Sequence, residues 1–527
     1  MNRGQMLERV LQRDATWDMV IIGGGASGVG VAVDAASRGY QVLLLEQYDF
    51  GKGTSSRSTK LVHGGVRYLE QGNISLVMEA LKERGLLRQN APHLVHDLAF
   101  VVPSYTWWES PFYGFGLKVY NMLSGRYRFG PTSRLSRDET LQRLPTIKTE
   151  GLKGGVVYYD GQFDDTRLLI NLVATAAEQG ATLLNYFAVT GLRRDAEGFV
   201  NGVTARDSES GRDYEFSARV VINASGVFCD SIRKMADPAA SSLVAPSQGI
   251  HLVFERSFLP GCSAIMVPHT ADGRVMFAIP WHDHTLVGTT DVAIHDTPIE
   301  PRATDEEINF ILETASRYLE RAPTRADILS VFAGIRPLVR AGDQKSTSSL
   351  SRSHTIHIDN SGLLTLTGGK WTTYRNMSED CVDQATTLAQ LEDRPCCTRT
   401  LAIHGHRVPD EALGHFTVYG SDALEIRNLI EENAAWGEPL HAALPYTAAE
   451  VIWATRHEMA RTVEDVLARR TRALFLNARA AIEMSSRVAA LMAEELGQNA
   501  SWQQQQITQF RELAAGYLPT CALRAQE

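Results

Sequence analysis

Long apolar runs are missing from this sequence. No stretch of its 527 residues approaches the roughly 20 consecutive apolar residues that a membrane-spanning helix needs. Residues 1–18 are amphipathic and lack the apolar core of a secretory signal. We therefore expect no transmembrane helix and no secretion signal, while attachment to a membrane surface stays open.

Cysteine is scarce, and a basic excess is absent. The chain has 52 Lys and Arg against 61 Asp and Glu, a formal net charge of −9, which argues against nucleic acid as a partner. Reduced cytoplasmic thiols are expected, because a chain of this length needs no disulfides. No Cys or His spacing predicts a metal site. The six scattered cysteines are Cys229, Cys262, Cys381, Cys396, Cys397 and Cys521.

What the sequence does contain is a dinucleotide-binding pattern across residues 18–46. Its glycines permit a tight turn, close approach of backbone N–H groups to a pyrophosphate, and close helix–strand packing. Glu46 follows the second strand, where a carboxylate accepts ribose hydroxyls. NAD and FAD both fit this stretch. Its parts are the strand Met19–Ile22, then Gly23, Gly25 and Gly28 in G-x-G-x-x-G spacing, a helical pattern, the strand Val42–Leu45 and Glu46.

Hydroxyl side chains and two further glycines follow. The residues are Thr54, Ser55, Ser56, Ser58 and Thr59, then His63, Gly64 and Gly65. They form either a solvated loop or one that covers the pyrophosphate and the isoalloxazine. Adjacent glycines let the backbone pass close to a flat ring, whereas NAD-binding domains usually continue here into another βα unit. This string therefore favours a flavin.

The string TSSRSTKLVHGGVRYLE, residues 54–70, after the glycine turn resembles the aerobic, FAD-dependent glycerol-3-phosphate dehydrogenases. That family belongs to the D-amino-acid-oxidase-like flavoproteins and has Leu where this chain has Val66. The likeness spans roughly residues 15–490. It implies FAD as cofactor and oxidation of sn-glycerol 3-phosphate to dihydroxyacetone phosphate. It also implies peripheral attachment to the inner face of the cytoplasmic membrane, with ubiquinone or menaquinone as electron acceptor, and a homodimer is expected.

The resemblance also implies a substrate site. Arginine forks hold a phosphate better than a point charge does. For the general base we expect His251, since imidazole titrates near working pH, with His63 as the alternative. Arg336 and Lys370 complete the catalytic set, and Asp291 is expected to be structural. The expected substrate contacts are Arg67, Tyr68, His251, Arg336, Arg352 and Lys370.

Cofactor contacts are expected along much of the chain. A helix beginning near Thr372, after Gly368 and Gly369, directs its N-terminus at the pyrimidine end of the flavin. Asn223-Ala224-Ser225-Gly226 resembles the ATG turn of the FAD fold. The full set is Gly23, Gly25, Gly28, Glu46, Thr54, Ser55, Ser56, Ser58, His63, Gly64, Gly65, Val189, Ala224, Gly226, Arg336, Gly369, Lys370 and Thr372.

Nine aromatic residues lie between Tyr105 and Phe129, accompanied by Lys and Arg. Such a mixture suits the interface of an anionic membrane, where rings lie at headgroup depth. A core patch or a dimer contact would use the same residues. The family resemblance favours the membrane.

The predicted fold combines α/β and α+β parts. Residues 15–85, 150–235 and 330–390 form a discontinuous, Rossmann-like FAD-binding domain. Residues 86–149 and 236–329 form a substrate domain with an antiparallel sheet and the membrane-facing segment. Residues 400–527 form a helical cap domain, in which Thr447 and Glu450 make a capping box.

Two other functions use the same flavin fold. One is an oxidase of glycerol 3-phosphate or of a small amino acid, with oxygen as acceptor. The other is a redox-sensing flavoprotein with little turnover. Several cations at one site favour the phosphorylated substrate over both.

Overall fold

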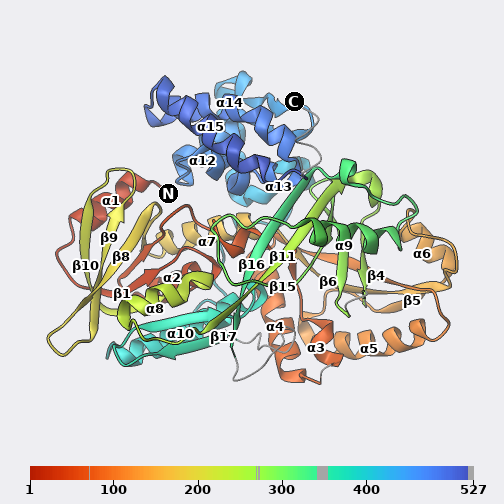
Figure 1. The fold of residues 1–527 in the computed structure, drawn as a ribbon, viewed down its shortest axis with the longest axis horizontal. Helices are drawn as coiled ribbons and strands as arrows, with labels where there is room; N and C mark the ends of the chain where they lie inside the picture. Colours follow the sequence, from red (N-terminus) through yellow and green to blue (C-terminus); the bar gives the residue numbers. More distant parts are fainter. Residues whose placement is uncertain (71, 269, 271–272, 341–353, 520–527) are drawn as a thin grey trace.

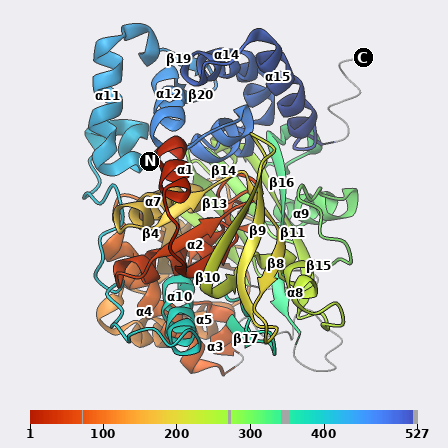
Figure 2. The same ribbon diagram turned by 90° about the vertical axis from the view of Figure 1, so that its left-hand side faces the viewer.

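Two large sheets form the body of the molecule, and C-terminal helices cover one end of it (Figures 1 and 2). This arrangement is seen in a computed structural model that describes residues 1–70, 72–268, 270, 273–340 and 354–519. The side chains of Arg67 and Glu70 also lie outside the described part. The expected fold class is confirmed.

The first sheet contains the strands on either side of the glycine turn. β1 pairs in parallel with β2 and β10, and β10 pairs in parallel with β18. Both faces of these strands are buried, as a parallel sheet requires. In spatial order its strands are β17 (His354–Ile358), β18 (Leu364–Gly368), β10 (Asp213–Asn223), β1 (Trp17–Ile22), β2 (Val42–Leu45) and β7 (Thr182–Leu184), with β9 (Val200–Asp207) and β8 (Phe187–Arg194) joined through β10.

Helices cover this sheet and one another. α2 packs against both α7 and α10, and α1 contacts β7. α2 directly follows the glycine turn, as the sequence predicts. The helices are α1 (Arg3–Leu11), α2 (Ala26–Ser37), α7 (Asp165–Glu178), α8 (Cys229–Ala236) and α10 (Tyr374–Leu388).

The second sheet is mainly antiparallel, apart from the parallel pair β12 and β4. It runs β15 (Val292–Ala293), β11 (Val244–Glu255), β14 (His284–Gly288), β13 (Met276–Trp281), β12 (Ser263–Val267), β4 (Val95–Ser104), β6 (Gly154–Phe163) and β3 (Leu61–Val62). β16 (Ser330–Val339) pairs with β11, and β5 (Ser133–Leu135) pairs with β6. β6 and β16 thus join this sheet, although we expected residues 150–235 and 330–390 in the FAD-binding part. The domain boundaries stay a prediction.

Helices also border the second sheet. α9 (Asp305–Ser316) lies within residues 236–329, for which the sequence predicted an antiparallel sheet and no helix was named. α3, α4 and α5 lie together at the end of the molecule opposite the C-terminal helices (Figures 1 and 2). The remaining helices here are α3 (Val66–Glu70), α4 (Ile74–Asn90), α5 (Glu109–Leu123) and α6 (Arg137–Arg143).

The C-terminal part is helical, with one short hairpin. Thr447 and Glu450 form the predicted capping box at the start of α12. No helix in the described ranges combines the length and apolarity needed to cross a membrane. The elements are α11 (Ala423–Glu432), β19 (Pro439–His441), β20 (Leu444–Thr447), α12 (Ala448–His457), a π-helical turn Asp465–Arg470, α13 (Ala473–Leu476), α14 (Ala478–Leu496) and α15 (Ala500–Ala515).

Candidate active site

A cavity of about 1150 Å³ lies between the two sheets. Residues that follow the carboxyl ends of β1, β2, β10 and β18 line it, which is where open α/β sheets bind ligands. On the other side it is lined by residues of β11, β13 and β16. One cavity therefore joins the glycine turn to the antiparallel sheet.

The glycine turn forms one wall of this cavity. Gly23 has φ +110°, a conformation that favours glycine, and Gly23 and Gly25 both line the cavity. A Cβ on Gly28 would lie 1.9 Å from the carbonyl oxygen of Gly23, so only glycine lets α2 approach the turn. The N-terminus of α2 thereby faces the cavity, where its partial positive charge suits a pyrophosphate. These residues fit a dinucleotide such as FAD.

Glu46 lines the cavity but is already engaged by the backbone. Its carboxylate accepts hydrogen bonds from the N–H of Gly24 at 2.6 Å and of Tyr48 at 2.9 Å. Burial raises the pKa of Glu46 above its usual value. The carboxylate thus fixes the turn after β1, and contact with a ribose stays a prediction.

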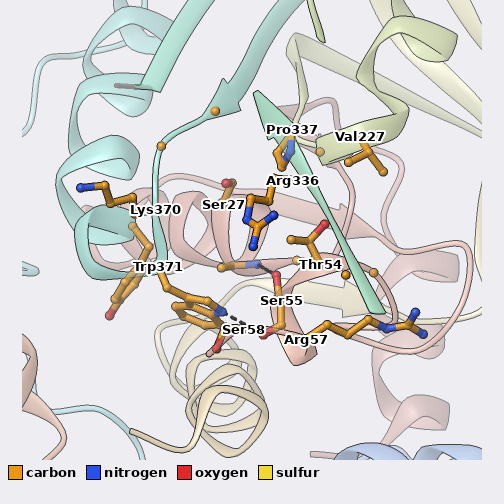
Figure 3. A pocket seen from close by; sticks show the side chains of 18 of the residues that line it. Ser27, Thr54, Ser55, Arg57, Ser58, Val227, Arg336, Pro337, Lys370 and Trp371 are labelled. Carbon is orange, nitrogen blue, oxygen red and sulfur yellow. Dashed lines mark hydrogen bonds between the residues drawn. The ribbon is translucent and has the colours of Figure 1, made fainter. Parts of the chain in front are cut away.

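The hydroxyl loop is anchored to its surroundings. Thr54 donates to the carbonyl of Ile335 at 2.6 Å, and Ser58 donates to Asp165 at 2.7 Å. Ser55 accepts from the N–H of Ala26 at 2.9 Å, so its hydroxyl reaches the first turn of α2. Its carbonyl accepts from the indole of Trp371 at 2.8 Å, as Figure 3 shows. These hydrogen bonds hold the loop in place as a wall of the cavity, so it is not a freely solvated loop.

His251 lies on β11 and is 2% exposed. Its Nε2 shares a hydrogen bond of 2.9 Å with Thr59, and its ring stacks on Phe332 with centroids 4.9 Å apart. Burial, together with the positive charges of Arg336 and Lys60, lowers the pKa of His251 well below 6.5. The imidazole is therefore neutral at pH 7, although the expectation was a group titrating near working pH.

Arg336 and Lys370 both line the cavity, and the positive charge of Arg336 acts on His251. Arg336, on β16, donates to Thr289 at 3.1 Å and lies 3.6 Å from Asp291, which is consistent with a structural role for that carboxylate. Lys370 lies 3.9 Å from the centre of the Tyr68 ring. Figure 3 shows Arg336 projecting among the side chains of the cavity, while Arg57 extends away from it. The cavity thus offers positive charge beside a neutral imidazole.

The structure brings most of the expected residues to this one cavity, and their roles stay predictions. Gly28, Ser56 and Gly64 do not line it and instead pack behind its wall. Arg352 and the Arg67 side chain lie outside the described residues. The expected residues that line the cavity are Gly23, Gly25, Glu46, Thr54, Ser55, Ser58, His63, Gly65, Tyr68, Val189, Ala224, Gly226, His251, Arg336, Gly369, Lys370 and Thr372.

Sequence reasoning missed the groups that support the site. The ammonium group of Lys60 is fully buried, contacts Asp165 at 2.7 Å and donates to the carbonyl of Ser56 at 2.7 Å. Asp160 lines the cavity and pairs with Arg84 at 2.6 Å. The only sequence signal for Lys60 is its position directly after the hydroxyl loop. Its partner Asp165 is 105 residues away, so the pairing itself carries no local signature.

Comparison with known proteins agrees with this geometry. A family model described as "FAD dependent oxidoreductase" matches residues 18–375. A second, described as "C-terminal domain of alpha-glycerophosphate oxidase", matches residues 363–507. The chain therefore belongs to the FAD-dependent oxidoreductases, and FAD is its cofactor.

Individual relatives indicate which kind of FAD-dependent oxidoreductase this chain is. A mitochondrial glycerol-3-phosphate dehydrogenase of Arabidopsis thaliana is 39% identical, covering 94% of this chain and 85% of the relative. The human mitochondrial enzyme is 38% identical, covering 95% and 74%. The crystal structure of a Bacillus halodurans glycerol-3-phosphate dehydrogenase complexed with FAD superposes with a TM-score of 0.80 at 29% identity, covering 98% of both chains. The chain is a member of the glycerol-3-phosphate dehydrogenase family.

Proposed function

We propose that this protein oxidises sn-glycerol 3-phosphate to dihydroxyacetone phosphate and passes the electrons to a membrane quinone. One observation carries the proposal: Arg336, Lys370 and a neutral His251 line the same cavity as the dinucleotide-type glycine turn. The names of the relatives support the substrate. An acidic chain that binds a phosphate ester needs this local concentration of positive charge.

The phosphate is the part of the substrate that these cations recognise. It carries nearly two negative charges, which a guanidinium fork and an ammonium group bind through charge-assisted hydrogen bonds. Arg336 lies within β16 and Lys370 follows β18, so two separate strands contribute these cations. We assign Tyr68, Arg67 and Arg352 to the same task on the resemblance alone.

The oxidation removes two hydrogens from the carbinol carbon and its hydroxyl. His251, our base, is neutral and so able to accept the hydroxyl proton. His63, which also lines the cavity, is the alternative. FAD, when bound, supplies the acceptor for the hydride. Arg336 stabilises the alkoxide charge that develops as the hydroxyl proton leaves.

The proposed attachment to a membrane depends on an exposed apolar surface. Trp107 is 83% exposed, Phe115 74% and Met122 73%, and all three lie on or just before α5. Large apolar side chains gathered at one end of a molecule mark an interaction site. We propose that this aromatic face lies on the inner surface of the cytoplasmic membrane. The homodimer stays a prediction.

The substrate is tested by mixing purified holoenzyme with glycerol 3-phosphate without oxygen and recording the flavin absorption. Bleaching within seconds, followed by faster recovery with a short-chain quinone than with air, is expected. Faster recovery in air would instead indicate an oxidase of the same substrate. Bleaching by glycine and not by glycerol 3-phosphate would indicate an amino-acid oxidase. A flavin that no compound bleaches would contradict the proposal and favour a redox sensor.

The membrane surface is tested with vesicles of anionic phospholipid. The double variant Trp107→Ser/Phe115→Ser removes two exposed rings, and we expect it to sediment with vesicles at least about tenfold less than the parent. Phe199→Ser is the matched control, because Phe199 is 52% exposed but lies in the turn between β8 and β9. Equal loss in both variants would contradict the assignment of this face.

A further inference from the structure

Helix α5 has two different faces. Phe115 and Met122 point outward and are exposed, whereas Leu117 and Tyr120 are each only 2% exposed. The ring of Tyr120 packs edge-on against Tyr158 of β6, with centroids 6.3 Å apart. The helix that carries the exposed aromatic face is therefore held to the second sheet by a buried tyrosine.

The hydroxyl of this tyrosine joins two groups far apart in the sequence. Tyr120 accepts a hydrogen bond of 2.7 Å from the backbone N–H of Gly64 and donates one of 2.6 Å to Asp160. Burial and the neighbouring Asp160 carboxylate raise the pKa of Tyr120 well above 10. The hydroxyl thus keeps its proton at working pH, and both hydrogen bonds persist.

A buried ion pair fixes the carboxylate end of this connection. Arg84 of α4 pairs with Asp160 at 2.6 Å, and their side chains are 1% and 3% exposed. The same guanidinium donates to the carbonyl of Tyr127 at 3.1 Å and lies 4.0 Å from the centre of the Phe129 ring. α4, β6 and the end of the aromatic segment thereby hold Asp160, which in turn orients the Tyr120 hydroxyl.

The other end is the loop that borders the cavity. The N–H of His63 donates to Thr372 at 3.2 Å, so the loop is held on both sides. A Cβ on Gly64 would lie 2.6 Å from the Tyr120 hydroxyl, so this close contact requires glycine. Directly beyond it, Gly65 and Tyr68 line the cavity, and Tyr68 is the residue whose ring contacts Lys370.

We propose that Tyr120 is a positioning residue, whose hydroxyl sets the place of the His63–Tyr68 segment against the flavin and the substrate. The inference rests on the proposed function and deepens it. One helix then performs two tasks, presenting apolar side chains outward and fixing the wall of the active site inward. α5 is thus joined to the cavity wall by this hydroxyl as well as by its packing against α3.

The test compares two tyrosine variants of the holoenzyme. Tyr120→Phe keeps the ring and removes the hydroxyl. Tyr186→Phe is the control, because Tyr186 is a partly buried tyrosine whose hydroxyl likewise donates to an aspartate, Asp465, at 2.7 Å, and it does not line the cavity. The measurements are the visible circular dichroism of bound FAD, the rate of flavin reduction by saturating glycerol 3-phosphate, and amide hydrogen exchange of the segment at Gly64.

We expect Tyr120→Phe alone to alter the flavin dichroism, to speed exchange at Gly64 and to slow flavin reduction at least about tenfold. Parental dichroism and exchange in Tyr120→Phe would overturn the inference, as would equal changes in Tyr186→Phe. If the parent itself is not reduced by glycerol 3-phosphate, the proposed function fails. The dichroism and exchange data still decide the role of Tyr120, and exchange is measurable even in a variant that retains little FAD.

Discussion

Charged side chains gather in two regions of this molecule, and the regions differ in what those side chains face. At the junction with the C-terminal helices, Arg469 and Arg470 are enclosed and both contact Asp49, at 2.5 and 2.7 Å. In the cavity, the side chain of Arg336 is 28% exposed and lies 3.6 Å from Asp291. Enclosed charges with close protein partners stabilise the fold, whereas charges that line an open cavity are available to a ligand.

At the junction, the enclosed guanidinium groups determine the pKa of the Asp49 carboxylate. Burial alone would raise the pKa of Asp49, but Arg470 and Arg469 lower it to about 2. The carboxylate therefore stays ionised inside the protein because two guanidinium groups compensate its lost hydration. Asp49 begins the loop that carries Thr54 and Ser55, so the C-terminal helices brace the cavity wall from outside.

The largest effect is expected where a junction cation is removed. Arg470→Met leaves Asp49 buried with less compensation, and we expect a loss of about 3 kcal/mol in the free energy of unfolding. Denaturant unfolding of the holoenzyme measures it. Arg206→Met is the control, since Arg206 and Asp213 form an exposed pair at 2.8 Å, whose loss should leave the free energy of unfolding nearly unchanged. Equal losses in both variants would remove the distinction between enclosed and exposed charges.

A slightly smaller effect, of a different kind, is expected in the cavity. Arg336→Met removes a charge-assisted contact to the substrate phosphate, so kcat/KM for glycerol 3-phosphate should fall about 100-fold, or ~2.7 kcal/mol. Stability should change little, which a thermal melt checks. Arg340→Met, at the exposed end of the same strand, is the control and should retain parental kcat/KM. If Arg336→Met melted at a far lower temperature but kept the parental kcat/KM, Arg336 would stabilise the fold and would not bind the substrate.

The smallest effect is pH-dependent and belongs to the junction. His404 contacts Glu178 at 2.6 Å and Asp422 at 2.8 Å. Although burial acts to lower its pKa, these two carboxylates raise it to about 9. Because the pKa of His404 is higher in the folded protein, the protonated imidazole stabilises the fold fully at pH values below its ordinary pKa of 6.5. This stabilisation is lost as the pH rises through about 9.

For this histidine, His404→Gln should cost about 2 kcal/mol near pH 6 and almost nothing near pH 10. The measurement is the difference in melting temperature between parent and variant at the two pH values. A difference that does not depend on pH would show that the ion pairs contribute nothing.

Local patterns in the sequence predicted the parts of the fold that depend on near neighbours. The glycine turn and the capping box of Thr447 and Glu450 each occupy a few consecutive residues, and both are present as predicted. α9 also has such a signal, the capping box of Thr304 and Glu307, and it was overlooked among the strands. A closer reading of residues 300–320 would have found it.

Contacts between distant residues had no comparable signal. β6 and β16 have the apolar character of strands, but nothing local determines which sheet they join. Gly64 and Tyr120 are 56 residues apart, and their hydrogen bond depends on the packing of α5 against β6. The contact of Glu46 with a ribose stays a prediction, and the two backbone N–H groups that bind its carboxylate had no sequence signal. The cavity residues were predictable as a set, and their supporting contacts were not.

We infer that the cavity cations select a phosphorylated substrate, and a comparison of glycerol 3-phosphate with glycerol tests this selection. The holoenzyme is mixed without oxygen with glycerol 3-phosphate or with glycerol at equal concentration, and flavin bleaching is followed by rapid-mixing absorption. We expect rapid bleaching by glycerol 3-phosphate and an oxidised flavin with glycerol. Equal bleaching rates for the two compounds would contradict it, because the phosphate would then contribute nothing.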